Sequence, residues 1–249
     1  MEFDFLLDNL DVIFVPAGLL IMFTYHLYLI YRVKRYPATT AIGYENYNRI
    51  AWVERMMLGD SSVKSLALSV ISSNISGATF LASVTLTLSS VIGVWLGSAS
   101  SNLFKNMFIL GEKSFTTVSL KYISMLLPFI LAFGSFVQSA RYLVQAGFFI
   151  STPNTDVPVE YVQSSVIRAN NFWHFGLRLL YFALAFMFWS FGSIPMFVSC
   201  LVMVMLLYFL DANSAPLHPY RPVKKVIEDE GSRAPWKAGG HGGGVGRNS

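Results

Sequence analysis

Six polar side chains fall inside or beside the long apolar tracts of this chain, where polar groups are costly. They are Asn74, Gln138, Arg141, Gln145, His174 and Arg178. Gln138, Arg141 and Gln145 recur at helical spacing and therefore share one face of a helix. His174 and Arg178 share a face of the next tract in the same way. Amide and guanidinium groups that converge within a membrane can bind anions. We therefore predict an inward-facing polar cavity that binds or passes a small anionic solute or a lipid head group.

Two other interpretations of these side chains stay open. An arginine near a helix end often reaches to phosphate head groups, which favours a non-catalytic structural or partner-binding membrane subunit. An enzyme that acts on lipid would need a nucleophile beside a base, and His174 with Ser72 or Ser73 is the pairing that the sequence offers. The directions of Arg141 and Arg178 would discriminate between a pocket and an anchoring role. In a pocket both side chains would point into one space, whereas as anchors they would point apart toward head groups.

Catalytic and cofactor signatures are missing from the sequence. It holds no HExxH, GxSxG or P-loop pattern, and no Cys or His cluster with zinc spacing. The single cysteine, Cys200, can form no internal disulfide. The acidic residues lie in the N-terminal flank, the loops and the tail, so we expect no carboxylate within the spans. We therefore expect no catalytic residue, metal, cofactor or nucleic-acid partner, and membrane lipids as the main contacts.

The polar residues stand in long apolar tracts, so the helices that these tracts form must position them. The chain has 54% hydrophobic and only 13% charged residues, which excludes a soluble domain that is polar on every side. About 20 apolar residues, at about 1.5 Å each, cross the hydrocarbon core of a bilayer. The sequence therefore predicts an all-α, polytopic transmembrane helical bundle in residues 1–212. Its spans are expected at about 12–31, 66–96, 120–150, 172–191 and 194–211.

The last apolar tract decides the number of spans. It is roughly twice as long as the about 20 residues that one span needs. The segment 191–195, Phe-Gly-Ser-Ile-Pro, interrupts it with the helix-stop and helix-start residues of a tight turn. We expect two spans here and five in all, or four if the tract is not split.

Basic residues set the expected orientation. Lys and Arg are absent before the first span, and Arg32, Lys34 and Arg35 follow it at once. The positive-inside rule then places the N-terminus outside and, after five spans, the C-terminus inside. Residues 213–249 become a basic, Pro- and Gly-rich cytoplasmic tail that we expect to be disordered. No retrieval signal or presequence is evident, which leaves the plasma membrane or an endomembrane.

Two further segments carry a pattern. Residues 44–55 mix charged and aromatic side chains and can form an amphipathic helix against the membrane. Along residues 69–90, Ser and Thr recur at helical spacing, and a second face of small residues lies nearly opposite. Because small residues let membrane helices approach closely, we expect the helix at 66–96 to lie at the centre of the bundle with two close neighbours. A homo-oligomer stays open.

Several of these pieces together carry a resemblance. The matching pieces are Tyr25-His26, Asn48-Arg49 with Trp52 and Glu54, Asn74 followed by Thr79-Phe80-Leu81-Ala82-Ser83, and Arg178 with Phe191-Gly192. Over residues 12–212 the chain resembles the domain-of-unknown-function 599 family of integral membrane proteins. The resemblance implies a helical membrane domain and a plant-like origin. It implies no activity and carries no functional residue over.

Overall fold

The computed structural model describes residues 2–99, 115–152 and 157–220. Their helices are α1 (Glu2–Arg35), α2 (Ala41–Leu58), α3 (Ser61–Ala99), α4 (Phe115–Ser151), α5 (Val159–Met187) and α6 (Ser193–Asp211). Within these ranges, 5 helices are long and apolar enough to cross a membrane: Asp11–Arg35, Ser61–Val94, Lys121–Ser151, Val159–Phe191 and Ser193–Asp211. The predicted all-α bundle with five spans is therefore confirmed. Its in–out orientation stays a prediction.

A tight turn separates α5 from α6. The α5 helix runs into a 3-10 turn at Phe188–Phe191, and Gly192 follows with a φ of 128°. Residues other than glycine rarely adopt this backbone conformation. Ser193 then begins α6, with Pro195 in its first turn, where a missing N–H costs least. The split of the last apolar tract therefore follows from a glycine and a proline, as the sequence predicts.

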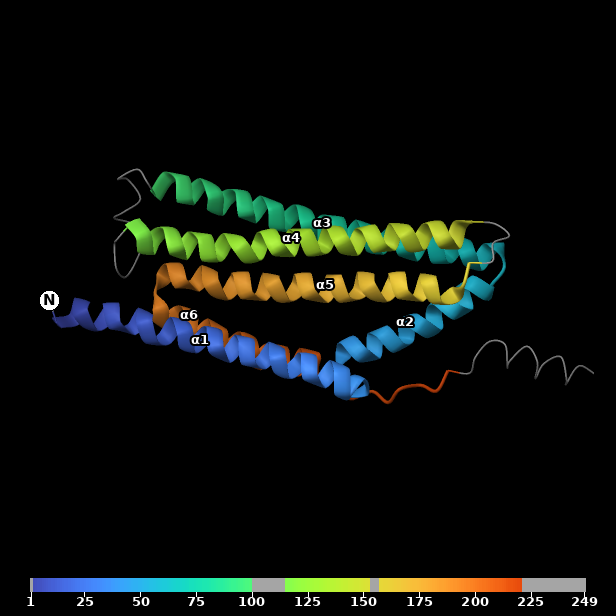
Figure 1. Ribbon diagram of the computed structural model, residues 1–249, viewed down its shortest axis with the longest axis horizontal. Coiled ribbons are helices and arrows are strands. Elements are labelled where there is room, and N and C mark those ends of the chain that lie inside the picture. Colours follow the sequence, from blue (N-terminus) through green and yellow to red (C-terminus); the bar gives the residue numbers. More distant parts are fainter. Residues whose placement is uncertain (1, 100–114, 153–156, 221–249) are drawn as a thin grey trace, which may run out of the picture. The chain divides into compact units, whose positions relative to one another are not determined.

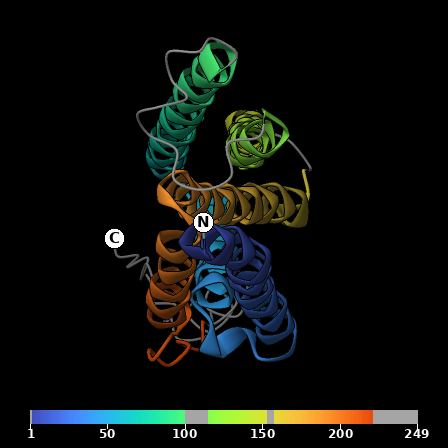
Figure 2. The same cartoon turned by 90° about the vertical axis from the view of Figure 1, so that its left-hand side faces the viewer.

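The α5 helix lies between two helix pairs. On one side α3 packs along α4 and α4 packs along α5, whereas α1 and α6 pack on each other (Figure 1, Figure 2). Phe136 of α4 is fully buried at the α4–α5 contact. A Cβ added at Gly176 of α5 would lie only 2.8 Å from the Phe136 ring. The small glycine therefore lets the two helices approach closely, which is how membrane helices associate without a hydrophobic drive.

The expectation that the 66–96 helix is central is wrong. The α3 helix packs chiefly on α4 (Figure 2). Its contacts with α2 and α5 are smaller, and a Cβ added at Gly77 would lie 3.8 Å from the Trp173 ring of α5. Ala78 and Thr85 are fully buried, while the opposite Ser/Thr stripe, which includes Ser76 and Thr79, is exposed. The Ser76 and Thr79 hydroxyls each donate to the carbonyl four residues earlier, at 3.0 and 2.9 Å. Because the helix itself satisfies these hydroxyls, the stripe needs no second neighbour.

The amphipathic segment of the sequence forms α2. Thr40 caps this helix, since its Oγ1 accepts from the Gly43 N–H at 3.2 Å. The helix crosses one end of the bundle from α1 to α3 and packs on α5 (Figure 1). Asn213, just after α6, donates its backbone N–H to the Thr39 carbonyl at 3.1 Å. The α1–α2 connection thereby also holds the end of α6.

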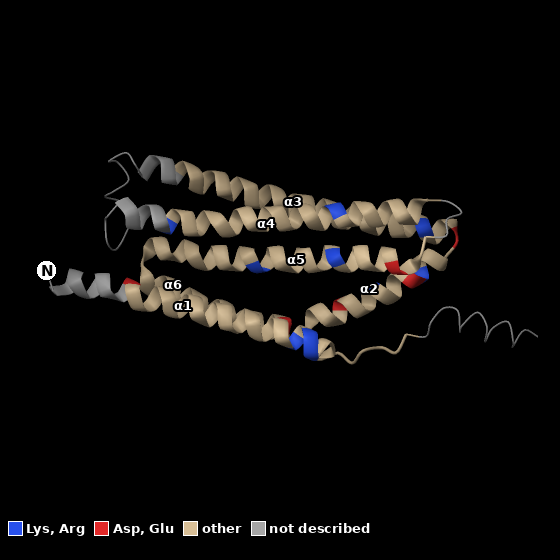
Figure 3. Ribbon diagram, in the orientation of Figure 1, with Lys and Arg blue, Asp and Glu red and all other residues tan. Residues whose placement is uncertain are grey.

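Charged residues are sparse along the helices and gather toward the end where α2 lies (Figure 3). This distribution fits a bundle whose middle faces hydrocarbon. Most of the predicted tail, residues 221–249, lies outside the described residues, as does the loop at 100–114.

Candidate functional site

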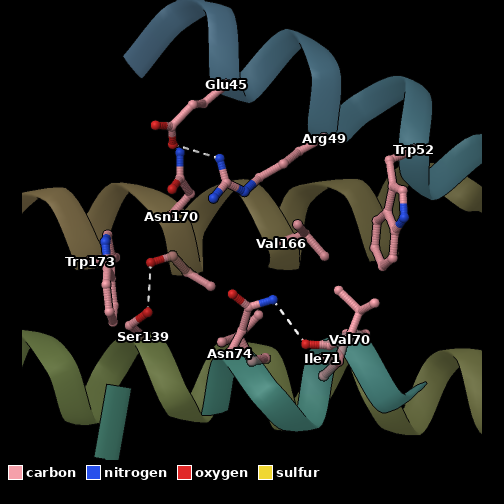
Figure 4. Close-up of a pocket in the computed structure, with 12 residues that line it drawn as sticks. Glu45, Arg49, Trp52, Val70, Ile71, Asn74, Ser139, Val166, Asn170 and Trp173 are labelled. Carbon is pink, nitrogen blue, oxygen red and sulfur yellow. Dashed lines mark hydrogen bonds and ion pairs between the residues drawn. The ribbon is translucent and has the colours of Figure 1, made fainter. Parts of the chain in front are cut away.

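A pocket of about 480 Å³ lies where α2, α3, α4 and α5 meet (Figure 4). Its lining residues are Glu45, Arg49 and Trp52 of α2, Val70, Ile71 and Asn74 of α3, Ser139 and Leu143 of α4, and Val166, Ala169, Asn170 and Trp173 of α5. The volume falls within the range of about 300–1,000 Å³ that small-molecule sites occupy. Apolar walls with a few polar groups are also typical of such sites.

An ion pair on α2 forms one flank of the pocket. Arg49 Nη1 lies 2.7 Å from Glu45 Oε2, at the i,i+4 spacing that places both side chains on one helix face. His174 of α5 contacts the same carboxylate oxygen with its Nε2, at 3.0 Å. The hydrogen bonds from His174 and then from Arg49 lower the pKa of Glu45 from its ordinary 4.5 to about 2. Glu45 is therefore ionised at any physiological pH.

A chain of asparagine amides joins α5 to α2 beside this pair. Asn170 Nδ2 donates to Asn46 Oδ1 at 2.8 Å, and Asn46 Nδ2 donates to Asn171 Oδ1 at 3.1 Å. The first of these bonds fixes the orientation of the Asn170 amide. Its Oδ1 is then buried and has no hydrogen-bond partner. A buried acceptor without a donor costs about 1–3 kcal/mol. A ligand that donated a hydrogen bond to this oxygen would remove that cost.

The opposite flank of the pocket combines satisfied polar groups with apolar side chains. Asn74 Nδ2 donates to the Val70 carbonyl at 2.9 Å. Ser139 Oγ of α4 donates to the Ala169 carbonyl of α5 at 2.8 Å, in a buried contact. Trp173 and Trp52 lie toward the two ends of the group of side chains in Figure 4. The pocket is therefore an elongated slot with an indole at each end.

The structure distributes the six predicted site residues over different surroundings. Asn74 lines the pocket, and His174 reaches it through Glu45. Arg141 and Gln145 are exposed on α4, and Arg141 bonds Gln138 of its own helix at 3.4 Å. Whether these residues take part in binding stays a prediction.

Arg178, the sixth predicted residue, turns toward α6. It pairs with Asp211, whose other oxygen accepts from the Tyr25 hydroxyl of α1 at 2.6 Å. Lys121 of α4 forms a second pair with Asp11 of α1, at 3.2 Å. Both carboxylates are end residues of membrane-spanning segments, and Asp211 is buried while Asp11 is partly exposed. The expectation that no carboxylate lies within the spans is therefore wrong at the span ends, where Asp11 and Asp211 each pair with a basic side chain.

Several lining residues were not singled out from the sequence. Glu45 and Arg49 carry a signal, since they stand four residues apart in the predicted amphipathic helix. Asn170 and Trp173 carry none, because only the contact of α5 with α2 brings them to the pocket. In the described part of the chain, no three His, Cys, Asp or Glu side chains converge as metal ligands would.

Comparison with known proteins gives a family but no activity. The model of the family described as Protein of unknown function, DUF599, matches residues 13–216. The chain belongs to this family. The matched range of this DUF599 protein includes every residue that lines the pocket and, apart from the first two residues of the first, the five apolar helices. No curated protein and no solved structure matches the chain. It is a multi-pass integral membrane protein, and the description of its family names no activity.

Proposed function

We propose that this protein binds the head group of a membrane lipid in the pocket between α2 and α5. The observation that carries the proposal is a buried acceptor without a donor, Asn170 Oδ1, in a slot that also holds the half-exposed Glu45–Arg49 pair. The Asn170 oxygen offers a hydrogen bond that the protein itself leaves unused, and the half-exposed pair can also contact a ligand. Apolar residues of the same slot, such as Ile71 and Leu143, can contact the first part of an acyl chain.

The length of α5 supports a position in the head-group region. The segment Val159–Phe191 has 33 residues, which extend about 50 Å at about 1.5 Å per residue. The hydrocarbon core is about 30 Å thick, so one end of this segment must project beyond it. The projecting end is the one beside α2, because that helix carries Glu45 and Arg49. The pocket then lies level with lipid head groups.

A different observation favours a second candidate function, the structural or partner-binding subunit. The exposed stripe of Ser76, Thr79 and Ser83 leaves a smooth outer face on α3. Small residues on such a face suit close packing of a second membrane helix. In that case the protein would assemble with a second copy of itself, and the pocket would hold no selective ligand.

Native mass spectrometry of the full chain tests the two candidates together. The protein is extracted with its own lipids, and wild type is compared with the pocket variants Arg49→Gln and Asn74→Leu. Arg141→Gln is the matched control, since Arg141 is exposed and does not line the pocket. We expect a discrete lipid adduct in wild type and control, and a loss of about tenfold or more in Arg49→Gln, because a hydrogen bond to a charged group is worth about 1.5–3 kcal/mol.

The outcomes separate the candidates. If the lipid adduct is equally abundant in all four proteins, the lipid does not bind in the pocket and the proposal is wrong. A stable homo-oligomer without any retained lipid would replace lipid binding by the subunit role. Circular dichroism and the unfolding midpoint of each variant show that a lost adduct does not reflect a lost fold.

A further inference from the structure

The charges along the pocket are balanced. Glu45 and Arg49 are the charged side chains among the lining residues, and they lie 2.7 Å apart at their nearest atoms. His174 contacts the same Glu45 oxygen as Arg49 does. An anion that approaches Arg49 therefore also approaches the Glu45 carboxylate, and the attraction and the repulsion largely cancel. A net negative charge gives a ligand little advantage in this slot.

The unpartnered amide oxygen selects for a donor. Asn170 is 4% exposed, and its Nδ2 is already bonded to Asn46. The remaining Oδ1 can only accept a hydrogen bond. An ionised phosphate or carboxylate oxygen has no proton to donate to it. A hydroxyl group can donate its proton to such an oxygen, and hydroxyls can also accept from a guanidinium such as that of Arg49.

The two indoles add flat apolar surface. Trp52 and Trp173 both line the pocket, and each is partly buried. Trp173 is held in place by an edge contact with Phe136, with ring centroids 5.6 Å apart. The C–H face of a sugar ring can pack on such a surface by dispersion contacts, whereas a compact phosphate group cannot. The slot thus combines donors, an acceptor and ring surfaces.

We infer that the head group bound here is a neutral, hydroxyl-rich one, a sugar or another polyol, rather than an anionic phosphate. This inference rests on the proposed lipid binding and specifies its chemical class. Hydroxyls of the ring donate to Asn170 and Glu45 and accept from Arg49. The ring face packs against an indole, and the acyl chains leave the slot toward the bilayer.

The test uses the purified full chain, stripped of its own lipids, in a neutral detergent. It is incubated with equal amounts of three lipids that carry the same acyl chains: a monohexosyl diacylglycerol, a phosphatidic acid and a phosphatidylethanolamine. Native mass spectrometry then gives the adduct ratios. We expect wild type to retain the monohexosyl lipid about tenfold over phosphatidic acid, which is the factor that about 1.4 kcal/mol gives.

The ratio of monohexosyl lipid to phosphatidic acid adducts is also measured in two pocket variants and one control. Asn170→Leu replaces the amide by an apolar group of similar volume, and Trp52→Leu removes one indole. Both should bring the ratio near unity, and either one suffices if the other does not fold. Gln145→Leu makes the same kind of change at an exposed position of α4 outside the pocket. It should leave the ratio as in wild type.

Each alternative result has a defined meaning. Phosphatidic acid or phosphatidylethanolamine retained as well as or better than the monohexosyl lipid, and lost in Arg49→Gln, would overturn the polyol head group and keep lipid binding in the pocket. A preference for the monohexosyl lipid that survives both pocket variants would also overturn the inference. If the pocket variants change the retention of none of the three lipids, the proposed function fails with it.

Discussion

The α5–α6 contact and the α2–α5 pocket each contain an arginine paired with a carboxylate. At the first, Arg178 pairs with Asp211, and their side chains are only 12% and 5% exposed. At the second, Arg49 pairs with Glu45, and their side chains are 34% and 39% exposed. The first pair is enclosed by helices and serves the fold, whereas the second borders a pocket and can contact a ligand. The difference shows that burial, rather than residue type, decides what such a pair can do.

A third side chain strengthens the contrast. The Tyr25 hydroxyl occupies the second oxygen of Asp211, so α1, α5 and α6 meet at one carboxylate. At the pocket, His174 and Arg49 share one oxygen of Glu45. These two contacts hold Glu45 at the edge of the pocket, where its side chain is 39% exposed.

The largest expected effect tests the buried pair. Asp211→Leu leaves Arg178 as a buried charge without its partner and takes the acceptor from Tyr25. Removal of one member of a buried pair costs about 3–5 kcal/mol. We expect a large fall in the unfolding midpoint in detergent, followed by circular dichroism or by intrinsic fluorescence. In the double variant Asp211→Leu/Arg178→Leu, part of the loss should return because no charge remains unpaired. If Asp211→Leu is no less stable than Glu45→Gln, the contrast between the two pairs is wrong.

A smaller effect is expected on α5 between the two regions. Gly176 lies between Trp173 of the pocket and Arg178 of the buried pair, and an added Cβ would meet the buried Phe136 ring at 2.8 Å. Gly176→Ala should therefore destabilise the protein by about 1–3 kcal/mol through overpacking. Gly134→Ala on α4 is the control, since its Cβ would meet nothing within 4 Å.

The control should gain up to about 1 kcal/mol from the better helix propensity of alanine. The unfolding midpoint measures both changes, and the native adduct ratio shows whether the pocket moves with α5. Equal stabilities of the two glycine variants would mean that α4 and α5 do not pack as closely as described.

The smallest effect is expected from the ionisation of Glu45. Its pKa is lowered from 4.5 to about 2 by the hydrogen bonds from His174 and Arg49. A lowered pKa means that the ionised carboxylate stabilises the folded state fully above pH 4.5, and that this contribution is lost as the pH falls toward 2. Because the pair is more than a third exposed on average, we expect less than about 1 kcal/mol.

The comparison is between wild type and Glu45→Gln, with the unfolding midpoint measured from pH 6 down to pH 2. The advantage of wild type should shrink across this acidic window and disappear at its lower end. Two parallel curves would show that the ionisation of Glu45 adds no stability, and that the lowered pKa does not affect folding.

Much of the fold could be predicted because its signals are local. Each apolar tract is long enough to span a bilayer by itself, and Gly192 with Pro195 marks the one turn within the last tract. The position of α3 could not be predicted. Its two small faces look alike in the sequence, and hydroxyls on both faces bond to carbonyls of their own helix. Only the packing of α3 on α4 decides that the face with Ala78 and Thr85 is buried.

The candidate site could be predicted only in part. Asn74 was expected in a polar cavity and does line the pocket. Arg178 was expected in the same cavity, but Asp211 binds it at the α6 contact. Helical spacing shows which residues share a face, but not which helix that face will meet. The pocket depends on contacts between helices that are far apart in the sequence. Asn170, for example, bonds to Asn46, which is 124 positions away in the chain.

The sequence alone determined that this chain is a membrane protein of five apolar helices, because length and hydropathy act within each segment. The sequence match over residues 13–216 determined its family. Only the tertiary structure decided which polar residues meet. In lipid no hydrophobic drive selects one helix face over another, so the partners of Glu45, Asn170 and Arg178 are set by close packing. That packing buried one arginine–carboxylate pair and left the other at the edge of a pocket.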